Sequence, residues 1–295
     1  MRFGTVLVLL LCNLMWAANI VVSKLVVTDL GVPPLFYALM RSLLVVLALA
    51  PVLRRIPPKL PQVLLVGLAI GGGSFALLFM GLKTASPSAA GIVNLSGAPM
   101  TVLFAIVFLG ERIKWRRSIG IALTLAGVGI AIGSPSAEGA ASGLLLIFAA
   151  AVLGALGAVF FKRIEIRALD MQAWAGVASA AVLLPLTFTM EQGQRQAVEA
   201  APLETGAALL FAAIVVSIGA HTAYYKILQR EDANLVVPLT LLTPLLTIAM
   251  GAFITGDPIG WPLLAGGALA IAGVAIIVLR PSRTMFKPLL VRPRI

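Results

Sequence analysis

Residues 96–131 read SGAPMTVLFAIVFLGERIKWRRSIGIALTLAGVGIA, and residues 241–277 read LLTPLLTIAMGAFITGDPIGWPLLAGGALAIAGVAII. The two stretches are one pattern that occurs twice. With one residue of slippage the following positions correspond: Pro99 with Pro244, Glu111 with Asp257, Trp115 with Trp261, Gly120 with Gly266, and Gly127 with Gly273. A repeat of about half the chain, in a sequence this apolar, indicates a membrane transporter built from two related bundles.

The composition excludes a soluble domain. Hydrophobic residues make up 60% of the chain and charged residues 11%, and the mean hydropathy is +1.07. Runs of about 18 or more apolar residues are long enough to cross a bilayer as helices. We predict an all-α integral membrane protein with ten transmembrane helices, near residues 5–27, 34–53, 61–82, 87–109, 117–133, 142–161, 171–190, 205–227, 234–254 and 260–279.

The positive charges predict the orientation. The net charge is +11, and all but four of the 22 basic residues fall in segments on one side of the predicted spans. Basic loops stay in the cytoplasm, so we expect both termini to be cytoplasmic, in a bacterial cytoplasmic (inner) membrane. The basic excess then reports orientation rather than a nucleic-acid partner, and the lipid bilayer is the expected surrounding.

Ten spans and a repeat give five spans to each half. Because five is odd, the second half enters the membrane from the opposite side, so the halves are expected to be inverted repeats around a central cavity. The predicted boundaries are 1–136 for the first repeat, 137–280 for the second and 281–295 for a basic cytoplasmic tail. Trp115 lies among basic residues and its counterpart Trp261 does not, which agrees with inversion.

Pro99 and Pro244 fall near the middle of the fourth and ninth spans. Proline cannot donate to the carbonyl four residues back, so the carbonyls of Leu95 and Thr240 are expected to lose their helix partners. Paired interruptions in two inverted halves point to a central substrate site and to helix kinks or gates. The alternative is that the two prolines only bend their helices.

The chain resembles the EamA-type carriers of the drug/metabolite transporter superfamily. The residues that carry the resemblance are Trp16 with Asn19 and Lys24, Pro99 through Leu109-Gly110-Glu111, and Pro244 through Gly256-Asp257-Pro258. Within that family the chain is most similar to bacterial amino-acid exporters of the YddG type. The resemblance implies a ten-helix inverted-repeat carrier in which spans one to four and six to nine surround the cavity.

The spans contain no central acidic residue, since all eleven Asp and Glu residues fall in loops or at span ends. This disfavours proton-coupled export of cations through a membrane carboxylate and favours a small zwitterionic or neutral metabolite. The resemblance to amino-acid exporters implies amino acids with aromatic or other apolar side chains as the expected substrates. Arg41 lies inside the second span with Tyr37 one turn earlier. A charge there costs about 2.5–3.5 kcal/mol, so Arg41 either binds a substrate carboxylate or pairs with backbone carbonyls or headgroups.

Other candidate substrate-binding residues lie in five further spans. His221, with Ser217 and Tyr224 one turn away on either side, is either a proton-sensitive cavity residue or a neutral histidine bonded to a neighbouring helix. The remaining candidates are Asn13, Trp16 and Asn19 in the first span, Phe75 and Phe79 in the third, Asn94 in the fourth and Trp174 in the seventh. Taken singly, each could equally pack helices together.

Two rival functions remain open. Ser74 beside Gly72 and Gly73, with His221 as base, would suit an intramembrane serine hydrolase, but an enzyme does not explain the repeat. A sugar-phosphate or nucleotide-sugar carrier would need more basic groups than Arg41 and Lys24. One histidine and one cysteine make no metal-ligand set, so no metal or cofactor is expected. Because an enzyme does not explain the repeat, the protein is not expected to be an enzyme. Small residues in the fifth and tenth spans would permit a weak homodimer.

Overall fold

The computed structural model describes residues 3–133, 140–161, 163–231 and 236–278, and every regular element in these ranges is helical. Eight of the described helices are long and apolar enough to cross a membrane, and two shorter apolar helices, Pro34–Ala48 and Leu239–Thr255, accompany them. The chain is therefore a multi-pass membrane protein, as its composition predicts. The predicted tail, 281–295, and the predicted junction of the repeats at 136 and 137 lie outside the described residues.

The helices follow one another with short connections. Up to residue 133 they are α1 (Phe3–Thr28), α2 (Pro34–Ala48), η1 (Ala50–Arg54), α3 (Leu60–Leu68), η2 (Ala69–Gly73), α4 (Ser74–Leu82), α5 (Pro87–Asn94), α6 (Gly97–Leu109) and α7 (Trp115–Gly133). From residue 140 they are α8 (Ala140–Phe161), α9 (Ala168–Met190), α10 (Gln194–Ala200), α11 (Pro202–Leu210), η3 (Phe211–Ala220), α12 (His221–Arg230), η4 (Val237–Leu241), α14 (Leu242–Met250), η5 (Gly251–Thr255) and α15 (Trp261–Val278).

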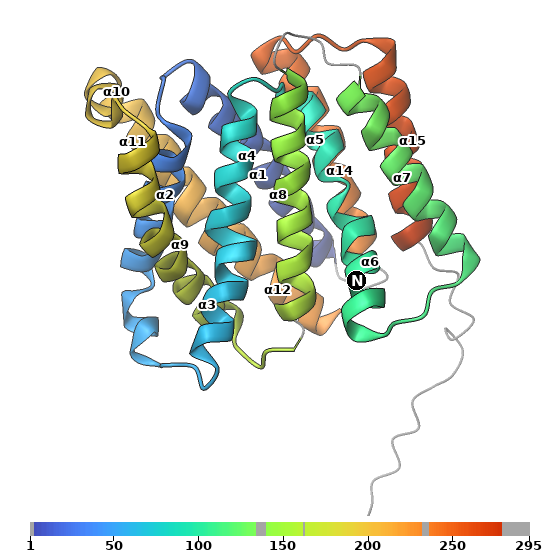
Figure 1. Cartoon of the computed structure of the whole chain (residues 1–295), viewed down its shortest axis with the longest axis horizontal. Coiled ribbons are helices and arrows are strands. Elements are labelled where there is room, and N and C mark those ends of the chain that lie inside the picture. The colour runs from blue at the N-terminus through green and yellow to red at the C-terminus, as the bar shows by residue number, and fades with distance from the viewer. Residues whose placement is uncertain (1–2, 134–139, 162, 232–235, 279–295) are drawn as a thin grey trace, which may run out of the picture.

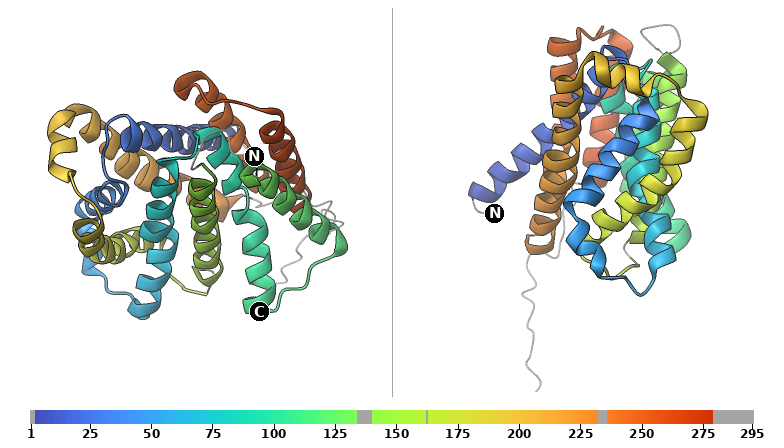
Figure 2. Two further views of the ribbon diagram at one scale, coloured as in Figure 1. Left: turned by 45° about the horizontal axis from the view of Figure 1, so that its top comes forward. Right: turned by 90° about the vertical axis from the view of Figure 1, so that its left-hand side faces the viewer.

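The long helices run side by side between two faces (Figure 1). We call the face that holds residues 28–34, 82–87 and 190–202 the outer face, after the orientation that the charges predict, and the opposite one the inner face. In Figure 1 the outer face, with α10, lies at the top. The helices α7 and α15 lie together at one edge of the bundle (Figures 1 and 2).

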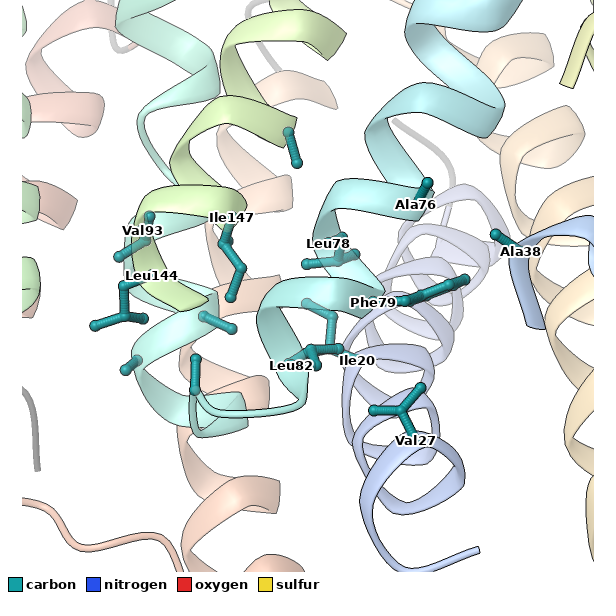
Figure 3. Packing of buried hydrophobic residues seen from close by; sticks show 14 of the residues in the cluster. Ile20, Val27, Ala38, Ala76, Leu78, Phe79, Leu82, Val93, Leu144 and Ile147 are labelled. Carbon is teal, nitrogen blue, oxygen red and sulfur yellow. The ribbon is translucent and has the colours of Figure 1, made fainter. Parts of the chain in front are cut away.

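The main hydrophobic core fills the outer half of the bundle. It joins α1, α2, α4, α5 and α8 through fully buried side chains such as Val27, Phe79 and Leu144 (Figure 3). Among the described residues the inner half holds two smaller clusters, around Val45 and around Val63. Close packing therefore seals the bundle on the outer side, where apolar side chains from many helices meet.

Helix α1 is more exposed along its inner half than along its outer half. Val21 and Val26 are buried, whereas Leu7 and Leu11 are each 48% exposed, although Leu9 between them is fully buried. In the right-hand view of Figure 2 the N-terminal part of α1 slants away from the other helices. The inner half of α1 therefore packs through one face only.

The chain is interrupted ahead of both midspan prolines. Between α5 and α6 the N–H groups of Leu95, Ser96 and Ala98 donate to carbonyls three residues back. Ahead of Pro244 the 3₁₀ segment η4 is tightened in the same way. The expectation that the Leu95 carbonyl loses its partner is wrong, because this carbonyl accepts from the Ala98 N–H at 3.2 Å. In this tighter turn the N–H of Ala98, three residues on, supplies the hydrogen bond that Pro99 cannot donate to the Leu95 carbonyl.

Two π-helical segments, η2 and η3, widen the helices directly before α4 and α12. The segment η2 contains Gly71 with the non-helical angles φ −107° and ψ −106°. The N–H of Gly72 leaves the helix ladder and donates to Oγ of Ser179 in α9 at 2.7 Å. In the second segment, η3, Oγ of Ser217 donates to the Ala212 carbonyl five residues back. Such bulges occur mostly where a helix is shaped for a function.

Glycine contacts hold α7 and α15 together. A Cβ atom at Gly127 would lie 2.4 Å from the Gly266 carbonyl oxygen, and one at Gly120 would lie 2.7 Å from the Gly273 oxygen. These four glycines belong to the repeated pattern, and their lack of a side chain lets the two backbones touch. The repeated glycines therefore serve a contact within the chain.

Candidate functional site

A cavity of about 520 Å³ lies at the centre of the bundle. It is lined by residues of α1, α4, α5, α6, α8, α12 and α14, and among the predicted site residues these are Trp16, Asn19, Phe75, Asn94, His221, Tyr224 and Pro244. Its lining reaches from Gly91 on the outer side to Thr101 toward the inner face. The structure thus gathers seven predicted residues from separate helices around one space.

A second cavity of about 100 Å³ adjoins the first. Its lining includes Arg41, Gln172 and Ser217, and it shares Ile70, Phe75 and His221 with the large cavity. The shared residues make Phe75 and His221 the border between the two. A cationic compartment therefore lies beside a larger one with aromatic walls.

Arg41 is buried to 3% exposure in the middle of the bundle. Its Nε donates to Oγ of Ser217 at 2.9 Å, and its guanidinium carbon lies 3.5 Å from the centre of the Phe75 ring. Neither Nη1 nor Nη2 has a hydrogen-bond partner, although both atoms are buried. A planar guanidinium stacked on one face and bonded at one edge keeps two donors on its remaining edge, and a pair of donors of this kind matches the geometry of a carboxylate.

An aromatic group from α1 and α12 lines the large cavity. The Trp16 ring lies 5.4 Å from the His221 ring and 5.2 Å from the Tyr224 ring, centroid to centroid. The indole Nε1–H of Trp16 and the amide Oδ1 of Asn19 are buried without partners. One turn of helix thus offers a donor and an acceptor in the same cavity, beside aromatic surface.

His221 is fixed by the π-helical segment before it. Its Nδ1 lies 2.8 Å from the Val216 carbonyl oxygen. A carbonyl can only accept, so Nδ1 carries the proton and Nε2 of the neutral ring is an acceptor. The partner carbonyl thus belongs to the helix that carries His221 and not to a neighbouring helix, and the ring lines both cavities.

Five predicted residues do not line either cavity. Asn13 accepts from Thr243 Oγ1 at 2.6 Å, which ties α1 to α14. Tyr37 and Phe79 pack on each other within the outer core, fully buried. Trp174 donates to the Arg55 carbonyl near the inner face. Pro99 is buried in α6, and unlike Pro244 it does not contribute to the lining.

The structure also brings polar residues to the site that the sequence did not single out. Thr243 and Thr247 line the large cavity from α14, and Gln172 lines the small one from α9. Gln172 donates to the backbone carbonyl of Ser217 at 3.2 Å. For Thr243 the sequence did offer a signal, because the residue comes directly before Pro244. A proline frees backbone groups within a membrane helix, and such interruptions are tolerated where the chain is buried in protein or lines a cavity.

Ser74 lines the large cavity, but its hydroxyl is engaged elsewhere. Oγ donates to the Ala69 carbonyl at 2.5 Å and also lies 3.1 Å from the Ala150 carbonyl. Because the Nδ1 of His221 bonds the Val216 carbonyl, the two side chains form no nucleophile and base pair through that atom. The hydroxyl helps to close the π-helical segment instead.

A larger groove of about 820 Å³ lies between α3, α4, α8 and α9, and almost all of its lining is apolar. Leu65, Leu186 and Met190 in its wall are exposed, as expected for side chains that meet lipid tails. The groove lacks the convergent polar groups that orient a small ligand. The two central cavities are therefore the candidate site.

Known proteins resemble this chain over nearly its whole length. A model of the EamA-like transporter family matches residues 3–133 and 141–279. A probable amino-acid metabolite efflux pump of Salmonella typhimurium is 31% identical over 91% of this chain and 93% of its own length. A protein of the same description from Escherichia coli is 28% identical over the same shares of both chains.

Two further comparisons agree. A probable terminal-alkyne amino-acid exporter of Streptantibioticus cattleyicolor is 29% identical over 74% of this chain and 73% of its own length. A solved crystal structure superposes with a TM-score of 0.56, covering 95% of this chain and 98% of its own, at 22% identity. The last likeness concerns the fold alone.

Proposed function

Since the chain belongs to the EamA-like transporter family and is a transporter rather than an enzyme, we propose that it exports small zwitterionic metabolites, amino acids with aromatic or other apolar side chains. The observation that carries the proposal is the buried, partly unpaired Arg41 beside an aromatic-lined cavity. The amino-acid efflux named for the bacterial relatives supports the same substrate class.

Each part of an amino acid has a suitable partner in the site. The carboxylate would bind the Nη1 and Nη2 groups of Arg41, which lack other partners. The ammonium group would donate to Asn19 Oδ1, and an apolar side chain would lie against Trp16 and Tyr224. No carboxylate lines either cavity among the described residues, so the site suits a bound anion or zwitterion better than a cation.

We also propose that the eight long helices and the two shorter ones, α2 and the Leu239–Thr255 helix, make ten membrane crossings in two inverted halves, residues 1–136 and 137–280. The matched interruptions before Pro99 and Pro244 support this arrangement. So does the pairing of α7 with α15 through repeated glycines. The proposed location is the bacterial inner membrane, with both termini in the cytoplasm.

The asymmetric packing supports alternating access. The outer half is a single core, while the inner half of α1 packs through one face only and the central cavity extends toward the inner face. An exporter in this state would load substrate from the cytoplasm. Export then requires the outer core to part and the inner clusters to close, as in the rocking of two bundles about a fixed site.

Counterflow in proteoliposomes tests the function. Liposomes preloaded with one unlabelled candidate, an amino acid, a purine base or a phosphorylated sugar, should accumulate labelled phenylalanine or leucine only when an amino acid is inside. Saturation would exclude a channel. A clear signal for purine bases or sugar phosphates without one for amino acids would contradict the proposal. Arg41→Ala should reduce the rate while the purified protein stays folded.

A further inference from the structure

Arg41 carries a positive charge that nothing in the described structure neutralises. It takes part in no described ion pair, and no acidic residue lines either central cavity. Its one described hydrogen bond goes to Ser217, a neutral hydroxyl, and its described cation-π contacts are with the rings of Phe75 at 3.5 Å and Phe79 at 5.9 Å. A buried charge is costly unless it is paired and hydrogen-bonded.

Arg41 lines a small cavity and keeps two unpaired donors. Nη1 and Nη2 are buried and without partners, and Arg41 lines the cavity of about 100 Å³ together with Gln172, Ser217 and His221. Water molecules could accept from the two Nη groups, but they would leave the charge unbalanced. A monovalent anion satisfies the donors and the charge together, whereas a divalent anion would leave one uncompensated negative charge in the membrane interior.

We propose that the cavity that Arg41 lines holds a small inorganic monovalent anion, with chloride as the physiological candidate, whenever no substrate carboxylate is present. The anion binds Nη1 and Nη2, and the incoming carboxylate displaces it. The substrate-free carrier thereby keeps its buried charge paired while the site changes sides. Displacement rests on the proposed function, but anion binding by itself does not.

The first test measures the binding of radioactive chloride to the purified protein, with gluconate replacing chloride at constant ionic strength. Saturable binding approaching one chloride per chain is expected, with competition by bromide and none by sulfate. Arg41→Gln should abolish binding. Arg41→Lys keeps the charge but cannot present two parallel donors, so it should weaken binding by about tenfold or more.

Arg195→Gln is the matched control. Arg195 is an exposed outer-face residue paired with Glu199, so its loss should leave chloride binding unchanged. Since Arg41→Gln could fail to fold, the lysine variant keeps the test decisive, with folding checked by its elution as a single species. Absence of chloride binding to the wild type, or equal binding by the wild type and Arg41→Lys, would overturn the anion site.

The second test separates the anion site from the transport function. In amino-acid counterflow, chloride should raise the half-saturating substrate concentration of the wild type in proportion to its own concentration, while gluconate should not. Chloride binding through Arg41 without any amino-acid transport would refute the proposed function and leave the anion site standing. Amino-acid transport by a protein that binds no chloride would refute the anion site alone.

Discussion

The carboxylate Oδ2 of Asp257 accepts a hydrogen bond of 2.7 Å from the backbone N–H of Ser88. Ser88 lies in the first turn of α5, and Asp257 follows η5 after the left-handed Gly256, so the bond joins two helix ends on the outer face. The hydroxyl of Thr255 donates to the other carboxylate oxygen. A negative charge is favourable at a helix N-terminus because the free N–H groups there carry partial positive charge.

Two more ties of this kind close the outer face. Glu191 accepts from the N–H groups of Leu35 and Phe36 at the start of α2, both at 2.9 Å. The ammonium of Lys24 donates to the Leu82 carbonyl at the end of α4 at 2.8 Å. Each charge has the sign that its helix end favours. Under the proposed alternating access these ties would have to break or move for the outer core to open.

Asp257→Ala should therefore favour the outward-open state. A hydrogen bond to a charged group contributes about 1.5–3 kcal/mol, so its loss should raise the outward-open population roughly tenfold or more. The measurement is the rate at which a membrane-impermeant maleimide, added outside, labels Leu78→Cys in the central cavity, in a Cys12→Ser background. Glu199→Ala is the control, because Glu199 pairs only with the exposed Arg195. An unchanged labelling rate would show that Asp257 does not hold the outer face closed.

Much of the fold follows from composition, because lipid leaves a spanning chain little choice but continuous helices. The repeated glycines were visible as a pattern, but their use was not. A sequence does not say which way a helix is rotated. The small residues of spans five and ten predicted a contact between two copies of the chain, whereas the repeated glycines of these spans make a contact between α7 and α15 within one chain. Within α7, Gly129 and Gly133 are the glycines that face outward, since a methyl group at either position would meet nothing within 4 Å.

Polar and aromatic residues that share one helix face are the signal that the sequence offers for a cavity lining. Trp16 and Asn19 are such a pair, and both line the large cavity. The bond from Arg41 to Ser217 spans 176 positions in the chain and depends on how α2 and η3 are packed. Trp174 is an aromatic residue within a predicted span, as Trp16 is, but its indole donates to the Arg55 carbonyl near the inner face. The position and rotation of α9 in the bundle decide where this ring points, and the sequence of the span alone does not give them.

Gly127→Ala should destabilise the protein, because its methyl group would lie 2.4 Å from the Gly266 oxygen and 2.6 Å from the Ala270 nitrogen. Overpacking of this kind costs about 1–3 kcal/mol. Gly129→Ala is the matched control on the same helix, where a methyl group meets nothing within 4 Å and alanine favours the helix. Thermal unfolding of the two purified variants should differ by several degrees, and equal midpoints would contradict the close α7 to α15 contact.

Ser179→Ala should destabilise the π-helical segment η2. The Gly72 N–H would lose the hydroxyl that accepts from it, and an unsatisfied buried donor costs about 1–3 kcal/mol. Ser42→Ala is the control, because Ser42 Oγ only donates to the Ala38 carbonyl of its own helix. Hydrogen exchange at the η2 amides, measured in micelles, should speed up in the first variant alone. The same exchange in both variants would mean that Ser179 does not support the bulge.

Trp16→Phe tests whether the free indole N–H serves the substrate. Phenylalanine keeps an aromatic ring beside His221 and Tyr224 but removes the Nε1 donor, which is buried and has no protein partner. If a substrate oxygen accepts from this donor, its loss removes about 0.5–1.5 kcal/mol of binding, which corresponds to about 2- to 10-fold. The half-saturating amino-acid concentration in counterflow should rise by that factor, with the maximal rate little changed.

Trp174→Phe is the matched control for this change. The Trp174 indole donates to the Arg55 carbonyl at 3.2 Å and lines neither central cavity, so its loss should leave the half-saturating concentration unchanged. An equal rise in both variants would point to a general effect of losing an indole on helix packing. No rise in Trp16→Phe, with transport intact, would place the substrate away from the α1 face and move the binding site toward Arg41 and Phe75.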